Sequence, residues 1–88
     1  MVPVMFSGIV EARAKVRAAK MRGNCLRAAI ETPRGWKLAL GESVNVDGIC
    51  STVVARASRR FEVEYMPQTL RNTTAGAFAP NGQVNLER

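Results

Sequence analysis

Apolar and polar residues alternate along most of the chain, and this period-two pattern is typical of β-strands. It predicts strands over residues 9–19, 25–32 and 60–65, a shorter one around residues 84–86, and a hairpin over residues 42–54. In the strand at 60–65, Phe61, Val63 and Tyr65 fall on one face and two glutamates on the other. Most of the chain is therefore expected to form antiparallel strands.

Short turn signals separate these strands. Asp47 and Gly48 lie between two β-rich runs and tolerate the positive φ angles that a type I′ hairpin turn needs. Pro33 ends the second strand, because it has no N–H to donate to a ladder. Pro67 suits the first position of a helix and Gly76 suits a C-terminal cap, so one helix of about two turns is expected over residues 68–74.

The length favours closing these strands into a small barrel. A chain of 88 residues is expected to form one domain, and folding buries roughly 63% of the extended chain's surface, enough for one modest core. Closure removes exposed strand edges that otherwise promote aggregation. The expected fold class is therefore all-β, a small closed barrel with one short helix, and Trp36 and Leu38 are expected in its core.

The composition then limits the chemistry. The chain has no histidine, which excludes Ser-His-Asp and Cys-His mechanisms within it and zinc sites that use histidine. Acid–base chemistry would fall to carboxylates, lysines, Tyr65 or a thiol. Cys25 and Cys50 match no metal-ligand spacing, so no metal is expected. Two thiols without a secretory signal indicate a cytoplasmic chain, and without a run of about 18 apolar residues no membrane span is expected.

The formal charge of +6 attracts phosphates or acidic surfaces. The basic residues are scattered through predicted loops, however, which favours a solvated surface. A basic β-barrel that binds single-stranded nucleic acid is a remote alternative, because the five aromatic residues lack the regular placement of a base-stacking groove. We therefore expect no nucleic-acid partner.

Three stretches and the end of the chain, taken together, indicate a family. They are FSGIVE at residues 6–11, GESVNVDGICSTV at 41–53, MPQTLRNTT at 66–74, and VNLER at 84–88. In this order and spacing they resemble the N-terminal lumazine-binding domain of riboflavin synthase, a family shared with bacterial lumazine and yellow fluorescent proteins. The resemblance covers residues 5–88, so we expect a single lumazine-binding domain there and an N-terminal extension at residues 1–4.

The resemblance implies a six-stranded Greek-key barrel that binds 6,7-dimethyl-8-ribityllumazine or riboflavin in a shallow site. It also implies a transferase reaction of riboflavin biosynthesis, in which two lumazines give riboflavin and a ribitylamino-pyrimidinedione with no cofactor. The family's ligand contacts match these positions: Gly8, Ile9, Val10, Cys50, Ser51, Thr52, Glu64, Tyr65, Met66, Pro67, Gln68 and Thr69. A serine and a cysteine associated with activity in the family match Ser43 and Cys50, which are the candidate catalytic residues.

These residue types suit a flat ring with a hydroxylated side chain. Gly8 lets backbone come close to a ring, because it has no Cβ. Ring-sandwiching side chains are expected at Ile9, Val10 and Met66, and partners for the ribityl hydroxyls at Ser43, Thr52, Gln68 and Thr69. Plain structural roles stay open: a strand bulge at Gly8, a turn at Ser43, a strand position at Thr52, a helix start at Thr69, and pocket lining without nucleophilic chemistry at Cys50.

The sequence also departs from the family pattern. Ser51 stands where the family usually has leucine, which makes the pocket wall more polar, and Gln68 replaces a common glutamate. The enzyme carries two tandem copies of this domain, and the second copy is absent here. We therefore expect a homodimer with little or no synthase activity.

Two interpretations of this single domain stay open at the sequence level. It is half of a two-domain synthase, or it is a stand-alone flavin- or lumazine-binding protein without catalysis. The positive charge suggests that a phosphorylated flavin such as FMN is tolerated.

Overall fold

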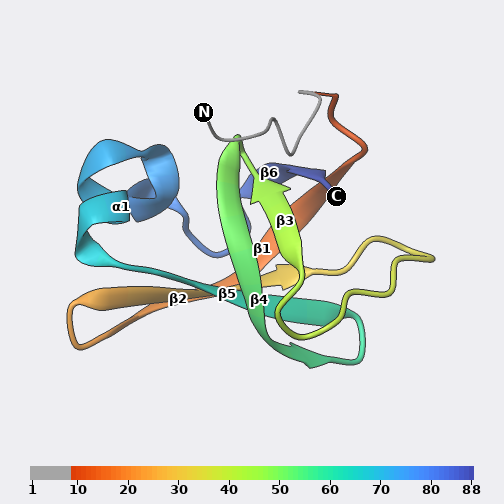
Figure 1. Cartoon of the computed structure of the whole chain (residues 1–88), viewed down its shortest axis with the longest axis horizontal. Helices are drawn as coiled ribbons and strands as arrows, with labels where there is room; N and C mark the ends of the chain where they lie inside the picture. Colours follow the sequence, from red (N-terminus) through yellow and green to blue (C-terminus); the bar gives the residue numbers. More distant parts are fainter. Residues whose placement is uncertain (1–8) are drawn as a thin grey trace.

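The computed structural model describes residues 9–88, so Gly8 and the extension expected at residues 1–4 lie outside the described part. The elements follow one another as β1 (Ala12–Arg22), β2 (Cys25–Glu31), β3 (Ser43–Val46), β4 (Ile49–Ala57), β5 (Arg60–Tyr65), α1 (Pro67–Asn72), the short 3₁₀ helix η1 (Thr74–Ala77) and β6 (Gln83–Glu87) (Figure 1). No helix in residues 9–88 is long and apolar enough to cross a membrane.

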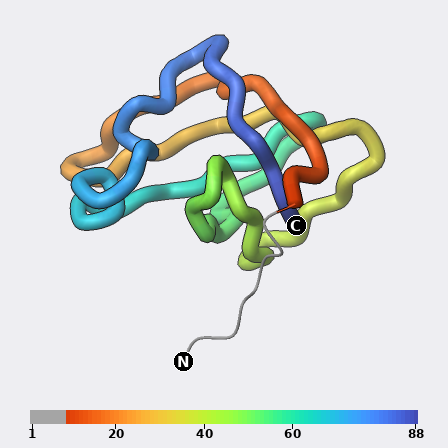
Figure 2. The backbone as a smooth tube through the Cα atoms, turned by 90° about the horizontal axis from the view of Figure 1, so that it is seen from above, coloured from red at the N-terminus to blue at the C-terminus, as the bar shows by residue number. Residues whose placement is uncertain are grey.

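The six strands close into an antiparallel barrel in the order β1-β2-β5-β4-β3-β6. This arrangement confirms the predicted all-β barrel with one short helix. The last residue lies beside the first described ones (Figure 2), because the backbone N–H of Arg88 donates to the Glu11 carboxylate at 2.6 Å. The guanidinium of Arg88 also sits 4.1 Å above the centre of the Trp36 ring.

Inward-facing side chains of all six strands form the core. The largest buried side chains are Phe61, Ile30, Leu86, Val16, Val44, Val46, Val53 and Val63. Their alternation with exposed neighbours is the period-two pattern of the sequence. Leu38 is buried as predicted, and Trp36 is half-buried against the same core.

The hairpin between β3 and β4 has the predicted turn. Asp47 and Gly48 have φ angles of 50° and 83°, both positive as a type I′ turn requires. Asp47 does more than turn the chain, because its carboxylate accepts the N–H of Asn85 at 2.6 Å. The hairpin tip is thereby tied to β6.

Several predicted boundaries were wrong. β1 ends at Arg22 and not at residue 19, and β4 runs to Ala57, beyond the predicted hairpin end at residue 54. β1 begins at Ala12 and not at residue 9, because Ile9 and Val10 lie exposed ahead of the ladder. The helix α1 ends at Asn72, since Thr73 is extended and its hydroxyl accepts the N–H of Ala75, which starts η1. Gly76 consequently lies inside η1 and does not cap α1.

Candidate functional site

Within the closed barrel, β4 and β5 pair over only part of their length and then diverge. Their ladder runs from Ala57↔Arg60 to Val53↔Val63 and includes no pair beyond Val53 within residues 9–88. The earlier residues of β4, 49–52, pair only with β3. The far end of β5 continues instead along β2 and into α1. We call the region between residues 49–52 of β4 and the end of β5 the opening (Figure 1).

Backbone groups of Cys50 face this opening. Val53 exchanges hydrogen bonds with the β3 side, donating to Glu42 O at 2.9 Å and accepting from Gly41 N at 2.8 Å. Because successive residues of a strand direct their N–H and C=O to opposite sides, those of Cys50 point toward β5. The ladder has already ended there, so a flat ligand with alternating acceptors and donors along its edge can use them.

A pair of hydroxyls crosses beneath the opening. Ser51 Oγ and Tyr65 OH lie 2.7 Å apart, and Ser51 Oγ also donates to the carbonyl of Ile49 at 2.9 Å. Both residues are only 3% exposed. Burial raises the pKa of the Tyr65 hydroxyl to about 12, so it stays protonated at neutral pH. This contact brings the predicted hairpin stretch and the predicted strand-to-helix stretch together.

Residues next to this pair point the other way, to the outer face. Cys50 and Thr52 are exposed on β4, while Ser51 between them is buried. Across the hairpin, Ser43 is opposite Thr52 and Asn45 is opposite Cys50. The structure therefore places both candidate catalytic residues, Ser43 and Cys50, on the same outer face of the hairpin. Asn45 joins them, although sequence reasoning missed it; the two-residue turn fixes the register that would have identified it.

The strand-to-helix junction supplies the other border. Met66 is 60% exposed, and its sulfur lies 3.4 Å from the Cys25 thiol of β2. Glu64 is also outward, but its carboxylate pairs with Arg27 Nε at 3.3 Å. The first turn of α1 follows, with Pro67, Gln68 and Thr69.

The first described residues approach the hairpin tip. Val10 lines a hollow of about 330 Å³ together with Asn45, Asp47 and Thr74. Ile9 is 68% exposed. Sequence reasoning missed Thr74, because its approach to the hairpin depends on the extended Thr73 that separates α1 from η1.

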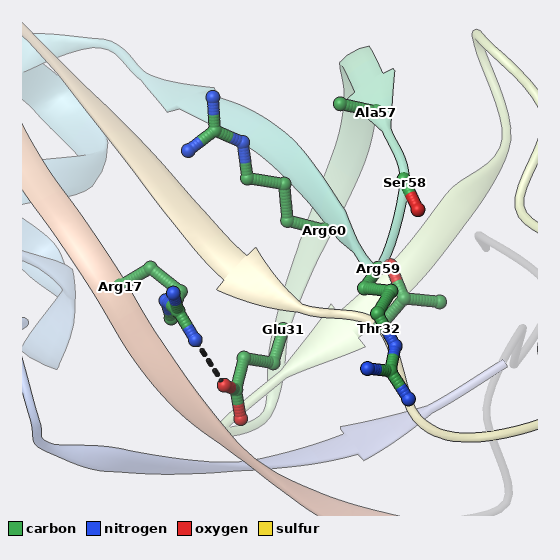
Figure 3. Close-up of a pocket in the computed structure, with 7 residues that line it drawn as sticks. All are labelled: Arg17, Glu31, Thr32, Ala57, Ser58, Arg59 and Arg60. Carbon is green, nitrogen blue, oxygen red and sulfur yellow. Dashed lines mark hydrogen bonds and ion pairs between the residues drawn. The ribbon is translucent and has the colours of Figure 1, made fainter.

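A second hollow, of about 690 Å³, lies at the other end of β4 and β5 (Figure 3). Arg17, Arg59 and Arg60 line it, and Arg17 is held by Glu31 at 2.6 Å. It contains none of the predicted ligand residues. Its lining is largely charged and hydroxylated, without an aromatic or large aliphatic side chain to cover a flat ring. The opening is therefore the better candidate site.

The chain is similar to known proteins over nearly its whole length. Residues 7–88 match the family described as Lumazine binding domain. Riboflavin synthase of Bacillus amyloliquefaciens is 35% identical over 85 residues, which cover 96% of this chain and 40% of that protein. Riboflavin synthase of Mycobacterium bovis is 36% identical over 86 residues, which cover 96% of this chain and 43% of that protein. The chain thus spans less than half the length of these relatives.

A solved structure shares the fold. The crystal structure of LumP complexed with 6,7-dimethyl-8-(1'-D-ribityl) lumazine matches with a TM-score of 0.83 and 17% identity, over 93% of this chain and 44% of that chain. The likeness agrees with the six-stranded barrel described above. The family match over residues 7–88 shows that the chain belongs to the lumazine-binding domain family, and its barrel is like that of LumP.

Proposed function

We propose that each chain binds one molecule of 6,7-dimethyl-8-ribityllumazine or riboflavin at the opening between β4 and β5. The observation that carries the proposal is the end of the β4–β5 ladder at Val53↔Val63. It leaves backbone groups of Cys50 facing a space that is bordered by the exposed side chains of Thr52 and Met66.

The proposed ligand fits these groups chemically. The pyrimidinedione edge of a lumazine presents two carbonyl acceptors and an N–H donor, which complement the N–H and C=O of Cys50. The exposed side chain of Met66 offers apolar surface to one face of the ring, and such contacts contribute about 2–4 kcal/mol. The ribityl hydroxyls need short polar partners, and Ser43 and Thr52 lie side by side across the hairpin.

Fluorescence titration tests this proposal. Riboflavin and the lumazine are each titrated with the protein at micromolar concentrations, and we expect saturable quenching or a spectral shift at one ligand per chain. A matched variant, Thr32→Val, changes the same chemical group near the arginine-lined hollow and is expected to bind as the wild type does. Absence of a saturable change at high micromolar protein would refute the assignment.

We further propose that the chain alone forms a homodimer with little or no synthase activity. The reaction needs two lumazines held face to face, and one domain holds one of them. A two-fold pair of identical barrels is the commonest way to bring two such sites together, but it repeats the same residues at both. Ser43 and Cys50 lie on one outer face of the hairpin, which supports a role for both side chains near the ligand. A pair of identical domains would lack the groups that a second kind of domain supplies, so the rate of riboflavin formation falls by orders of magnitude.

Sedimentation and a riboflavin-formation assay test this second proposal. A monomer at tens of micromolar would rule out the dimer, and turnover equal to that of a two-domain synthase would rule out the inactivity. We also propose that the chain is cytoplasmic, because its free thiols Cys25 and Cys50 would stay reduced there.

A further inference from the structure

We propose that the hydroxyl relay from Tyr65 through Ser51 to Ile49 is the positioning device of the site: it holds the Cys50–Thr52 edge of β4 at the distance from β5 that the ligand requires. The relay consists of the Tyr65–Ser51 contact of 2.7 Å and the Ser51–Ile49 contact of 2.9 Å. This inference rests on the proposed function, because it assigns the residues that position the proposed site.

The direction of the relay follows from counting protons. A serine hydroxyl has one hydrogen, and the carbonyl of Ile49 can only accept. Ser51 therefore donates its hydrogen to the carbonyl of Ile49, so Tyr65 must be the donor in its contact with Ser51. Tyr65 consequently has no hydrogen to offer a ligand while the relay is intact. Its role is to hold Ser51.

The relay acts where β4 and β5 share no ladder hydrogen bonds. Residues 49–52 have no ladder partner on β5 within the described chain. Toward β3 they are held by the hairpin, and toward β5 the hydroxyl pair is a buried side-chain hydrogen bond that links the two strands. Removing the Ser51 hydroxyl leaves the buried Tyr65 hydroxyl without its partner. Removing the Tyr65 hydroxyl leaves Ser51 bonded only to Ile49 of its own strand, so this hydrogen bond no longer ties β4 to β5.

A displacement of Ser51 reaches the ligand groups directly. Cys50 and Thr52 are its immediate neighbours, and both point outward while Ser51 points inward. Any rotation or shift of Ser51 therefore moves both at once. Tyr65 itself is anchored independently, since its ring makes an edge contact with Phe78 at a centroid distance of 5.9 Å. When only the Tyr65 hydroxyl is removed, the ring keeps Phe78 as its packing partner.

The test uses Tyr65→Phe, Ser51→Ala and the double variant, each titrated with 6,7-dimethyl-8-ribityllumazine, with Kd expressed per folded molecule. Each single variant is expected to raise Kd about five- to tenfold, and the double variant no more than the larger single effect, because one relay is broken in all three. Val84→Ala is the control, since Val84 is buried in β6 away from the opening. It should lower the unfolding midpoint and leave Kd unchanged.

Amide hydrogen exchange gives a second readout that a general loss of stability would not move. We expect exchange at the Ser51 amide, which faces β3 in the hairpin ladder, to speed up in Tyr65→Phe relative to exchange at Val63, whereas Val84→Ala should change both in proportion to global stability. If Ser51→Ala does not fold, Tyr65→Phe alone carries the test.

The outcomes separate the two proposals. A wild-type chain that does not bind lumazine refutes the proposed function, and the relay's role with it. A wild-type chain that binds, with single variants of unchanged Kd or with a double variant whose effect is the product of the two singles, refutes the relay alone.

Discussion

The Thr52→Val variant separates ligand binding from folding at one atom. Thr52 lies on the outer face of β4 opposite Ser43, and its hydroxyl makes no hydrogen bond within residues 9–88. Valine keeps the shape and the β-branched backbone preference of threonine. Folding therefore loses no bond, and the unfolding free energy should change by less than about 0.5 kcal/mol.

Binding should respond quite differently. Leaving a ribityl hydroxyl or ring group without its partner costs about 1–3 kcal/mol, which corresponds to a rise in Kd of roughly 5- to 150-fold. Because the site is open to solvent and water can replace part of the lost bond, we expect the lower end, about tenfold. Fluorescence titration and urea unfolding measure the two quantities on the same samples.

The control is Thr32→Val, which removes a hydroxyl from a half-buried position at the other end of β4 and β5. It should leave the lumazine Kd unchanged. An unchanged Kd in Thr52→Val would show that this hydroxyl does not contact the ligand. A large loss of stability with unchanged affinity per folded molecule would make Thr52 a structural residue.

Three further predictions concern the barrel itself. Tyr65 is the only tyrosine of the chain, so ultraviolet titration should show a phenol midpoint near 12, and a midpoint at 10 would contradict the burial argument. Because the folded pKa is raised, the stability that the buried neutral phenol contributes is complete below about pH 10. It is lost as the pH rises from about 10 to about 12. Hydrogen bonds from Arg88 lower the pKa of Glu11 below 4.5. The stability that the Glu11 carboxylate contributes is therefore present above pH 4.5 and lost as the pH falls through the lowered pKa of the folded protein. In Glu11→Gln the acid limb of the stability–pH curve should flatten, and an identical limb would argue against the contact. Phe61→Ala empties the middle of the core and should cost about 3–5 kcal/mol in urea unfolding, whereas a cost below 1 kcal/mol would mean that the core collapses around the gap.

Local sequence signals were enough to predict the hairpin side of the site. Alternation identified the strands, because one face of each is buried against the core. Asp47 and Gly48 fixed a two-residue turn, and with it the register that places Ser43 opposite Thr52. The face that carries Cys50 could therefore be derived from the residues between 42 and 54 alone.

The opening itself could not be predicted from such signals. It depends on where the β4–β5 ladder ends, and that is decided by packing between strands and by the irregularity between Val53 and Ala55. The Ser51–Tyr65 contact joins residues 14 positions apart on separating strands, which no local pattern encodes. The helix end was missed for a related reason, because the Thr73 side chain competes for the backbone with a hydrogen bond of its own.

The central claim is that the opening between β4 and β5 holds the ligand, and amide chemical-shift mapping with 6,7-dimethyl-8-ribityllumazine tests it most directly. We predict saturable shifts at Cys50, Thr52 and Gln68, with little change at Arg59 and Arg60, which lie at the other end of the same strands. Shifts confined to Arg59 and Arg60, with Cys50 and Thr52 unmoved at saturation, would contradict the account.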